Sequence, residues 1–178
     1  RDRHQQRGQV TEQFRPGKHG RIIIRGMPND LTNLLIRFFE QDNWNFQLSA
    51  DRPLLRLPFK GDHGAWNCFA QAIPEQQRVL FYSVMPFPTP ENRRAAMAEF
   101  ITRANYGLLI GNFELDYADG EVRYKTSLDV TGGELTTEML RTLVVVNVET
   151  LDHYLPGLLR VALEDCDPAE AVAMVEQS

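Results

Sequence analysis

The stretch GNFELDYADGEVRYKTSLDV, residues 111–130, decides the fold, because it predicts a β-hairpin with a turn at Asp119-Gly120. Glycine takes positive φ freely, as a two-residue turn of this kind requires. Side chains alternate along a strand, so the turn pairs Tyr117–Val122, Leu115–Tyr124 and Phe113–Thr126 on one face, and Asp116–Arg123 and Glu114–Lys125 on the other. A slip of one residue would break both sets of pairs. We therefore expect a defined register, with the apolar face buried and the charged face in solvent.

Three helices near this hairpin are predicted from capping residues at their starts and helix-breaking residues at their ends. They run from Thr89-Pro90 to Gly107, from Thr136 to about Leu155, and from Asp167-Pro168 toward the C-terminus. Gly107 is expected in the left-handed conformation, as is common for a glycine just past a helix end. Pro156-Gly157 is expected to kink or interrupt the second of these helices, because proline removes a backbone donor.

The first helix of the chain follows Met27-Pro28, with Asn29 or Asp30 as its cap, and ends near Asn43. Its apolar residues recur at helical spacing and form one face: Leu31, Leu34, Leu35, Phe38 and Phe39. Such a face usually packs in a core, but it also suits the recognition of a peptide. We predict Leu31, Leu34, Leu35, Phe38 and the nearby Trp44 as partner-binding residues, with core packing as the alternative.

Three strands are predicted between this helix and Thr89, at residues 55–60, 66–73 and 79–84. A short strand is also predicted before the helix, at 21–25. Pro58 cannot donate to a ladder, so the strand at 55–60 is expected at an edge. The strand at 79–84 is apolar on both faces except at Ser83, and is expected to be central or covered on both sides. With the hairpin, the order is α-βββ-α-ββ-α. This order predicts an α+β domain in which a single five-stranded antiparallel sheet packs with helices.

Three segments resemble the YbjN family: SVMPFPTPENRR at 83–94, NYGLLIGNFELDYADGEVRYKTSLDV at 105–130 and ETLDHYLPGLL at 149–159. The resemblance spans roughly residues 28–164, and its marks are turn, cap and core residues: Gly107, Gly111, Asp119, Gly120, Tyr154 and Pro156. Members of the family are described as bacterial sensory transduction regulators, with a fold similar to that of type III secretion chaperones. The resemblance implies a regulatory or chaperone-like module that binds extended partner segments through apolar surface, without a catalytic activity.

Charge is distributed unevenly along the chain. Residues 1–26 hold seven basic and two acidic side chains, a net charge of +5, and the whole chain has −5, so the remaining residues carry −10. We divide the chain into a basic arm at 1–26, a YbjN-like α+β domain at 27–164 and a C-terminal helical appendage at 165–178. The mild overall charge argues against nucleic-acid binding. The basic arm alone can contact a nucleic acid, a membrane surface or the acidic body, or stay solvated.

No group of residues has a spacing typical of catalysis or metal binding. The four histidines (His4, His19, His63, His153) share no ligand spacing, and Cys68 has no histidine nearby in the sequence. The acidic run at 164–170 lacks the glycine and the twelfth-position Glu of a calcium loop. Four aromatics near element ends (Trp44, Trp66, Phe87, Tyr106) suit either core edges or recognition surfaces.

The resemblance to the YbjN family implies a regulatory or chaperone-like protein, and together with these absences it leads us to predict a non-enzymatic protein that binds an unidentified protein partner, with no catalytic residue, metal or cofactor. The alternative is a small-molecule sensor or an enzyme with a pocket between sheet and helices. Two cysteines without a pairing motif, no run of the roughly 18–20 apolar residues of a membrane helix, and no signal-peptide core predict a cytoplasmic protein.

The helix that starts at Thr136 is apolar nearly all round, so more than one of its sides must be covered. We predict a homodimer with Met139, Leu143 and Val146 at the interface, in agreement with the dimers known for chaperones of the similar fold. Cover by the other helices of the same domain is the alternative.

Overall fold

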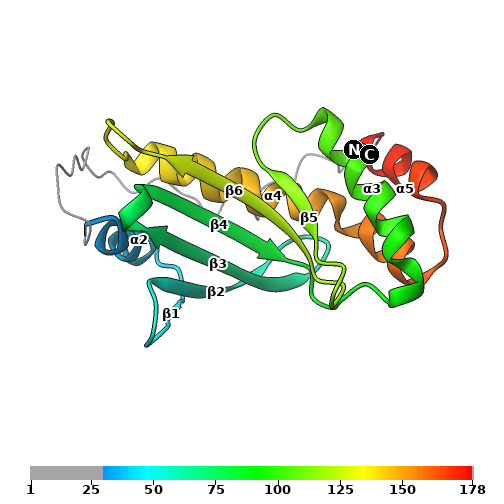
Figure 1. Cartoon of the computed structure of the whole chain (residues 1–178), viewed down its shortest axis with the longest axis horizontal. Coiled ribbons are helices and arrows are strands. Elements are labelled where there is room, and N and C mark those ends of the chain that lie inside the picture. The colour runs from blue at the N-terminus through cyan, green and yellow to red at the C-terminus, as the bar shows by residue number, and fades with distance from the viewer. Residues whose placement is uncertain (1–29, 178) are drawn as a thin grey trace, which may run out of the picture.

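The computed structural model describes residues 30–177, which form one antiparallel sheet with helices packed on it (Figure 1). In chain order the elements are α2 (Asp30–Gln41), β1 (Gln47–Leu48), β2 (Leu54–Lys60), β3 (Ala65–Ile73), β4 (Arg78–Val84), α3 (Arg94–Gly107), β5 (Asn112–Leu115), β6 (Val122–Asp129), α4 (Thr137–Leu163) and α5 (Pro168–Glu176). The strand order in the sheet is β1-β2-β3-β4-β6-β5. The predicted basic arm, the strand at 21–25 and the Asn29 cap lie outside the described residues.

The sheet has six strands, and so the prediction of five is wrong. The additional strand, β1, pairs Gln47 with Arg56 and Leu48 with Leu55 of β2. Two residues are too few to show the alternation that identifies a strand in a sequence. The outer strand on this side of the sheet is therefore β1, and not β2 as predicted. β1 pairs only with Leu55 and Arg56 of β2, so Pro58 lies outside this pairing.

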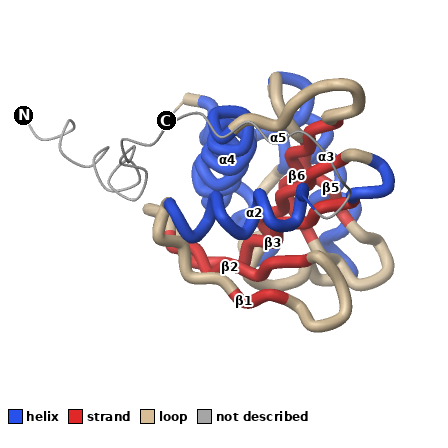
Figure 2. Tube along the Cα trace, turned by 90° about the vertical axis from the view of Figure 1, so that its left-hand side faces the viewer, coloured by secondary structure: helices blue, strands red, loops and turns tan. Residues whose placement is uncertain are grey.

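Helices α2 and α4 pack against the same face of the sheet (Figure 2). Phe39 of α2 stacks on Phe81 of β4 with 6.1 Å between the ring centroids. From α4, Asn147 donates through Nδ2 to the carbonyl oxygens of Phe81 and Tyr124, each at 3.0 Å. The opposite face is partly exposed; there the Arg123 guanidinium lies 4.6 Å from the Tyr82 ring centroid. β4 is central, as predicted.

The hairpin of β5 and β6 forms, but its register differs by two residues from the prediction. Phe113 pairs with Tyr124, and Leu115 pairs with Val122. The predicted two-residue turn is replaced by a longer connection, at whose base the Asp116 N–H donates to the Glu121 carbonyl oxygen at 2.9 Å. A four-residue loop built around a type I turn is a common alternative to the two-residue turn.

A shift of two residues keeps every strand side chain on its predicted face, because the alternation has a period of two. Phe113, Val122 and Tyr124 are accordingly buried as predicted. Tyr117, predicted on the buried face, is instead exposed in the connection. Glu114 accepts from Arg123 at 2.8 Å and also pairs with Lys125, so the predicted pairing of Asp116 with Arg123 is wrong.

The predicted helix starts at Thr136 and Asp167 are confirmed. Thr136 Oγ1 accepts from the backbone N–H of Met139 at 3.1 Å. Asp167 Oδ1 accepts from the N–H groups of Ala169 and Glu170 at 2.9 and 3.1 Å. Both side chains satisfy N–H groups that the helix itself leaves unpaired.

The predicted conformation of Gly107 and the predicted end of α4 are wrong. Gly107 is the last residue of α3 and has no positive φ; Gly111 is the glycine with φ of +82° after this helix. α4 continues through Pro156 to Leu163 without ending at Leu155. Proline removes one hydrogen bond of the helix, but the residues on both sides of it are buried, and this packing maintains the helix.

Helix α5 packs on α3 and α4 and shares the core of the domain. Its inward side chains Ala171, Val172 and Val175 are buried. Gly157 of α4 makes the close approach possible, because a Cβ at this position would lie 2.8 Å from Val175 Cγ2 and 2.9 Å from the Phe100 ring. The predicted boundary between domain and appendage therefore falls between helices that pack together.

Candidate functional site

The residues predicted to bind a partner from α2 lie mostly in the core. Leu34, Leu35 and Phe38 are buried, whereas Leu31 and Trp44 are partly exposed. Contact of a partner with these residues stays a prediction, and it would require α2 to give up its packing on the sheet. The burial favours a binding surface elsewhere on the molecule.

The three residues predicted at a dimer interface lie along one side of α4, because they are spaced at i, i+4 and i+7. Leu143 is buried, and Met139 and Val146 are partly exposed. The sheet, α3 and α5 all pack on α4. This packing matches the alternative to a dimer, in which other parts of the same domain cover the helix. A homodimer through these residues stays a prediction. Light scattering at micromolar concentration would contradict it by returning a single species of 20.4 kDa.

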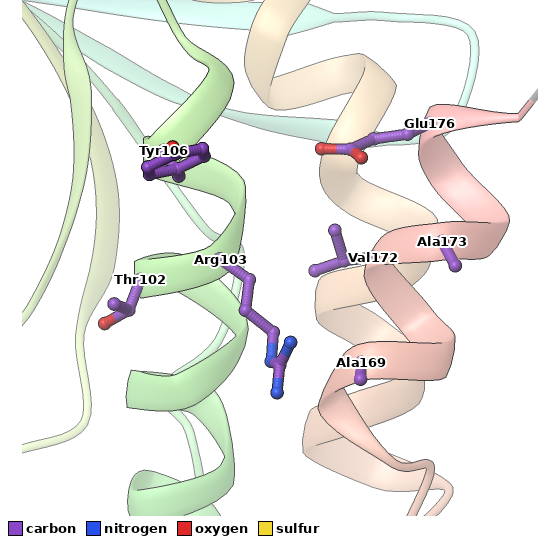
Figure 3. A pocket seen from close by; sticks show the side chains of 7 residues that line it. All are labelled: Thr102, Arg103, Tyr106, Ala169, Val172, Ala173 and Glu176. Carbon is purple, nitrogen blue, oxygen red and sulfur yellow. The ribbon is translucent and has the colours of Figure 1, made fainter.

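A shallow apolar groove lies between α3 and α5 (Figure 3). Its volume is about 460 Å³, and we define the α3–α5 groove by its lining residues: Thr102, Arg103, Tyr106, Ala169, Val172, Ala173 and Glu176. Val172 is largely buried between the two helices, whereas Ala173 and Tyr106 are open to solvent. The groove exists because α5 packs beside α3.

The segment that follows the exposed end of this groove presents large apolar side chains to solvent. We call residues 106–110 the apolar loop: Tyr106 is 97% exposed, Leu109 98% and Ile110 45%. Apolar surface gathered in one place on a protein marks interaction sites more often than isolated exposed residues do. Tyr106 was among the aromatics for which the sequence left a recognition role open. Leu109 and Ile110 were not predicted as binding residues. The one feature of the sequence that could have indicated them is the apolar triplet at 108–110 between two glycines.

Hydrogen bonds hold the apolar loop on both sides. Asn105 donates through Nδ2 to the Phe113 carbonyl oxygen at 3.1 Å and accepts from the Phe113 N–H at 2.7 Å. The Tyr124 hydroxyl donates to the Ile110 carbonyl oxygen. A Cβ at Gly111 would lie 2.6 Å from the Lys125 carbonyl oxygen, so the chain passes directly against β6. The exposed side chains are therefore carried by a fixed backbone.

Three of the polar side chains that line the α3–α5 groove already have partners within the protein. Thr102 Oγ1 donates to the Ala98 carbonyl oxygen at 2.7 Å. Arg103 pairs with Glu99 one helical turn earlier, with 2.8 Å between Nη2 and Oε1. Glu176 accepts from the Tyr154 hydroxyl at 3.1 Å.

The contact between Tyr154 and Glu176 joins α4 to α5 at the groove. Burial and the adjacent Glu176 carboxylate raise the pKa of Tyr154 to about 12. The hydroxyl is therefore protonated at neutral pH and donates to Glu176. The Tyr154 ring also contacts Phe100 of α3 and Phe113 of β5, with centroids 6.3 and 5.5 Å apart. Tyr154, which the family resemblance marks, thus has a packing role.

The groups that most resemble catalytic residues have structural explanations. Asp152 accepts from the N–H groups of Asp62 and His63 at 2.9 and 3.0 Å and so closes the turn between β2 and β3. His63 Nδ1 lies 3.5 Å from the same carboxylate. This acid–histidine pair joins residues 89 apart, and no sequence spacing announced it. Burial raises the pKa of the Cys68 thiol to about 12, so it stays protonated at neutral pH and is a poor nucleophile.

Two further searches concern the part of the chain that the structure describes. Among residues 30–177, no three His, Cys, Asp or Glu side chains gather closely enough to hold a metal ion. No helix in this range is long and apolar enough to cross a membrane.

Comparison with known proteins gives one family and similar folds. Residues 32–160 match the model of the YbjN family, described as "Putative bacterial sensory transduction regulator". The crystal structure of YbjN from E. coli, described as a putative transcription regulator, is 20% identical; the alignment covers 75% of this chain and 89% of that one, with a TM-score of 0.57. The crystal structure of the ExsC-ExsE complex contains a chain that is 13% identical, with 73% of this chain and 94% of that chain covered and a TM-score of 0.47. No curated protein matches the chain.

Proposed function

The chain belongs to the YbjN family, and on that premise we propose that it is a regulatory protein that acts by binding another protein and carries out no chemical reaction itself. The observation that carries this proposal is the apolar loop, which exposes Tyr106 and Leu109 almost completely beside the α3–α5 groove.

Exposed side chains of this kind favour protein binding for an energetic reason. Burial of a Leu-sized side chain contributes about 1.5–3 kcal/mol, and burial of an aromatic ring contributes at least as much. Tyr106 and Leu109 make almost no such contribution in the isolated chain. A partner that covers both would recover it, and Tyr is a residue type enriched among those that dominate binding energies.

The fixed backbone of the apolar loop supports the same proposal. Ordering a mobile loop on binding opposes association, typically by about 0.5–1.5 kcal/mol for each immobilised side chain. Here Asn105, Tyr124 and Gly111 hold the backbone before a partner arrives. The loop therefore has the pre-organisation expected of a recognition element.

A small-molecule sensor is supported less well by the α3–α5 groove. Small-molecule sites are enclosed and have a few unpaired polar groups that converge on the ligand. The groove is shallow, and Thr102, Arg103 and Glu176 already have partners. Its geometry suits a protein surface better than a metabolite.

The test is capture of bound molecules from a lysate of the source cells by the full chain, with proteins and small molecules both identified by mass spectrometry. We expect one or a few proteins, captured by the wild-type chain and lost with Leu109→Asp. Leu48→Asp is the matched control, because Leu48 is an exposed apolar residue on β1, away from the apolar loop. Capture of a metabolite or a metal in place of any protein would refute the proposal.

A further inference from the structure

We infer that the α3–α5 groove receives an amphipathic α-helix of the partner, with an apolar contact face and a flank of Lys or Arg along the α5 side. This inference rests on the proposed function and deepens it by naming the chemistry of the bound segment. Three features of the groove carry it: its occupied polar groups, its small side chains and the charge of its α5 border.

The occupied polar groups favour a helix over an extended strand. An extended chain brings backbone N–H and C=O groups that need partners, and an unpaired buried group costs roughly 1–3 kcal/mol. The groove is formed by two helices, and Thr102, Arg103 and Glu176 are already paired. A helix satisfies its own backbone, so it can lie in such a groove without unpaired groups.

The small side chains of α5 allow a third helix to approach closely. Ala169 and Ala173 are four residues apart, so they lie on the same side of α5, and Figure 3 shows them one turn apart along it. Val172 lies between α5 and α3, and Tyr106 stands at the end of α3. The groove is thus bordered on the α5 side by small side chains and has the apolar Val172 at its base. Tyr106 adds one large aromatic side chain that a partner can cover.

The α5 side of the groove carries acidic and no basic side chains: Glu176 lines the groove, Asp167 caps α5 and Glu170 lies in its first turn. Two further acidic residues, Glu164 and Asp165, precede α5. Glu164 pairs with Arg160, and Asp165 pairs with Arg93. Within residues 30–177, Asp167, Glu170 and Glu176 form no ion pair. Arg103 on the opposite border is neutralised by Glu99. A partner helix with Lys or Arg along the α5 side therefore complements the border, which affects both orientation and association rate.

Two other occupants have to be separated from a partner helix. The basic arm at 1–26 has a net charge of +5 and belongs to the same chain. A second copy of the protein could also cover the apolar loop and the groove together. Both become outcomes of the experiment below.

The probe is a display library of random 16-residue peptides, selected against the full chain. Selected peptides are then measured by fluorescence anisotropy against the wild type, Ala173→Arg and Ala95→Arg. Ala173→Arg fills the groove at an exposed helical position that tolerates arginine. Ala95→Arg places the same side chain at an exposed position of α3 that does not line the groove.

We expect peptides with apolar residues at i, i+3 or i+4, and i+7, and with Lys or Arg along one flank. They should bind the wild type and Ala95→Arg equally, and Ala173→Arg at least about tenfold more weakly. Tyr106→Ala should weaken binding as well, and added salt should weaken it further. Circular dichroism should show helix formation in the bound peptide.

Several results would overturn the inference: no enriched peptide, peptides with strand-like alternation or acidic flanks, or equal binding to Ala173→Arg. Selected sequences that match residues 1–26 would identify the basic arm as the occupant. A dimer in light scattering that Ala173→Arg converts to a monomer would identify a second copy. If proteins from the lysate still bind Ala173→Arg, the groove inference fails while protein binding stands. If the wild type captures no protein, the proposed function itself fails.

Discussion

Helix α2 and the apolar loop at 106–110 both present apolar side chains, and the structure places them in opposite environments. In α2 the apolar residues recur at helical spacing, and Leu35 and Phe38 are 1% and 3% exposed. In the apolar loop Tyr106 and Leu109 are more than nine-tenths exposed. Both segments contain several apolar residues, so their presence alone does not explain the difference.

The geometric reason is the periodicity of the two segments. A helical stripe can pack along its whole length against a sheet, and α2 does so through Phe39 and Phe81. The apolar loop begins at the last residues of α3, which ends at Gly107, and Asn105 and Gly111 then hold the chain in an irregular path. Apolar residues at the end of a helix or outside any helix or strand are thus the better candidates for a binding surface. Four predictions test this comparison.

The largest effect is expected for Phe38→Asp, which places a charge in the core beneath α2. Loss of the ring and burial of a carboxylate should lower the free energy of unfolding by at least about 4 kcal/mol. Urea denaturation followed by circular dichroism measures this change. Phe38→Leu is the control and should lose less than half as much. If Phe38→Asp lowers the free energy of unfolding by less than 1 kcal/mol, Phe38 is not a core residue, and α2 is again a candidate surface for binding a partner.

The next largest effect is expected for Gly120→Val in the hairpin connection. Gly120 has φ of +84°, and a Cβ there would lie 2.2 Å from the Thr89 carbonyl oxygen. We expect a loss of more than about 2 kcal/mol from backbone strain and the clash together. Gly132→Val is the matched control, because Gly132 has φ of +72° but open space around its Cβ position. Equal losses in the two variants would show that contact with Thr89 is unimportant.

A smaller effect is expected at Glu114 on the partly exposed face of the hairpin. Burial raises the pKa of this carboxyl, but hydrogen bonds and charge interactions with Lys125 and Arg123 outweigh burial and hold the pKa below its ordinary value. A lowered folded-state pKa stabilises the protein above the ordinary carboxyl pKa, and this contribution is lost as the pH falls through the folded value.

Glu114→Gln measures this contribution. At pH 7 the variant should be less stable than the wild type by about 0.5–1 kcal/mol, as expected for a partly exposed ion pair. The difference should shrink as the pH is lowered below the ordinary carboxyl pKa. Urea denaturation of both proteins at several pH values tests this, and a difference that does not change with pH would show that the charge is unimportant.

The smallest effect is expected for Leu109→Asp in the apolar loop. Leu109 is 98% exposed, so its replacement removes no packing in the isolated chain. The free energy of unfolding should change by no more than about 0.5 kcal/mol, while capture of a partner is lost. Denaturation and capture assays on the same preparation make the comparison with Phe38→Asp direct. A strongly destabilised Leu109→Asp would mean that the loop is part of the core.

Much of the fold was predictable because its signals are local. The Thr136 and Asp167 caps and the alternation of buried Trp66 and Cys68 with the less buried Asn67 each depend on residues close in sequence. The strand β1 was not predictable, since two residues show no period. The hairpin register was wrong by two residues because an Asp-Gly pair also fits a longer connection.

The candidate site was hardly predictable. Its groove needs α5 to pack beside α3, and this packing depends on Gly157, more than 50 residues from Arg103 and Tyr106. No local sequence pattern near Leu109 indicates that the apolar loop faces solvent. Tyr106 was recognised only as an aromatic with two alternative roles.

The sequence by itself determined the α+β class, the family, the caps of α4 and α5 and the faces of the hairpin strands, because capping and alternation act over a few residues. The tertiary structure decided which apolar segments are covered. It buried α2, carried α4 past Pro156 to Leu163, paired His63 with Asp152 and left Tyr106 and Leu109 in solvent. Burial depends on which distant elements meet, and local sequence preferences do not contain that information.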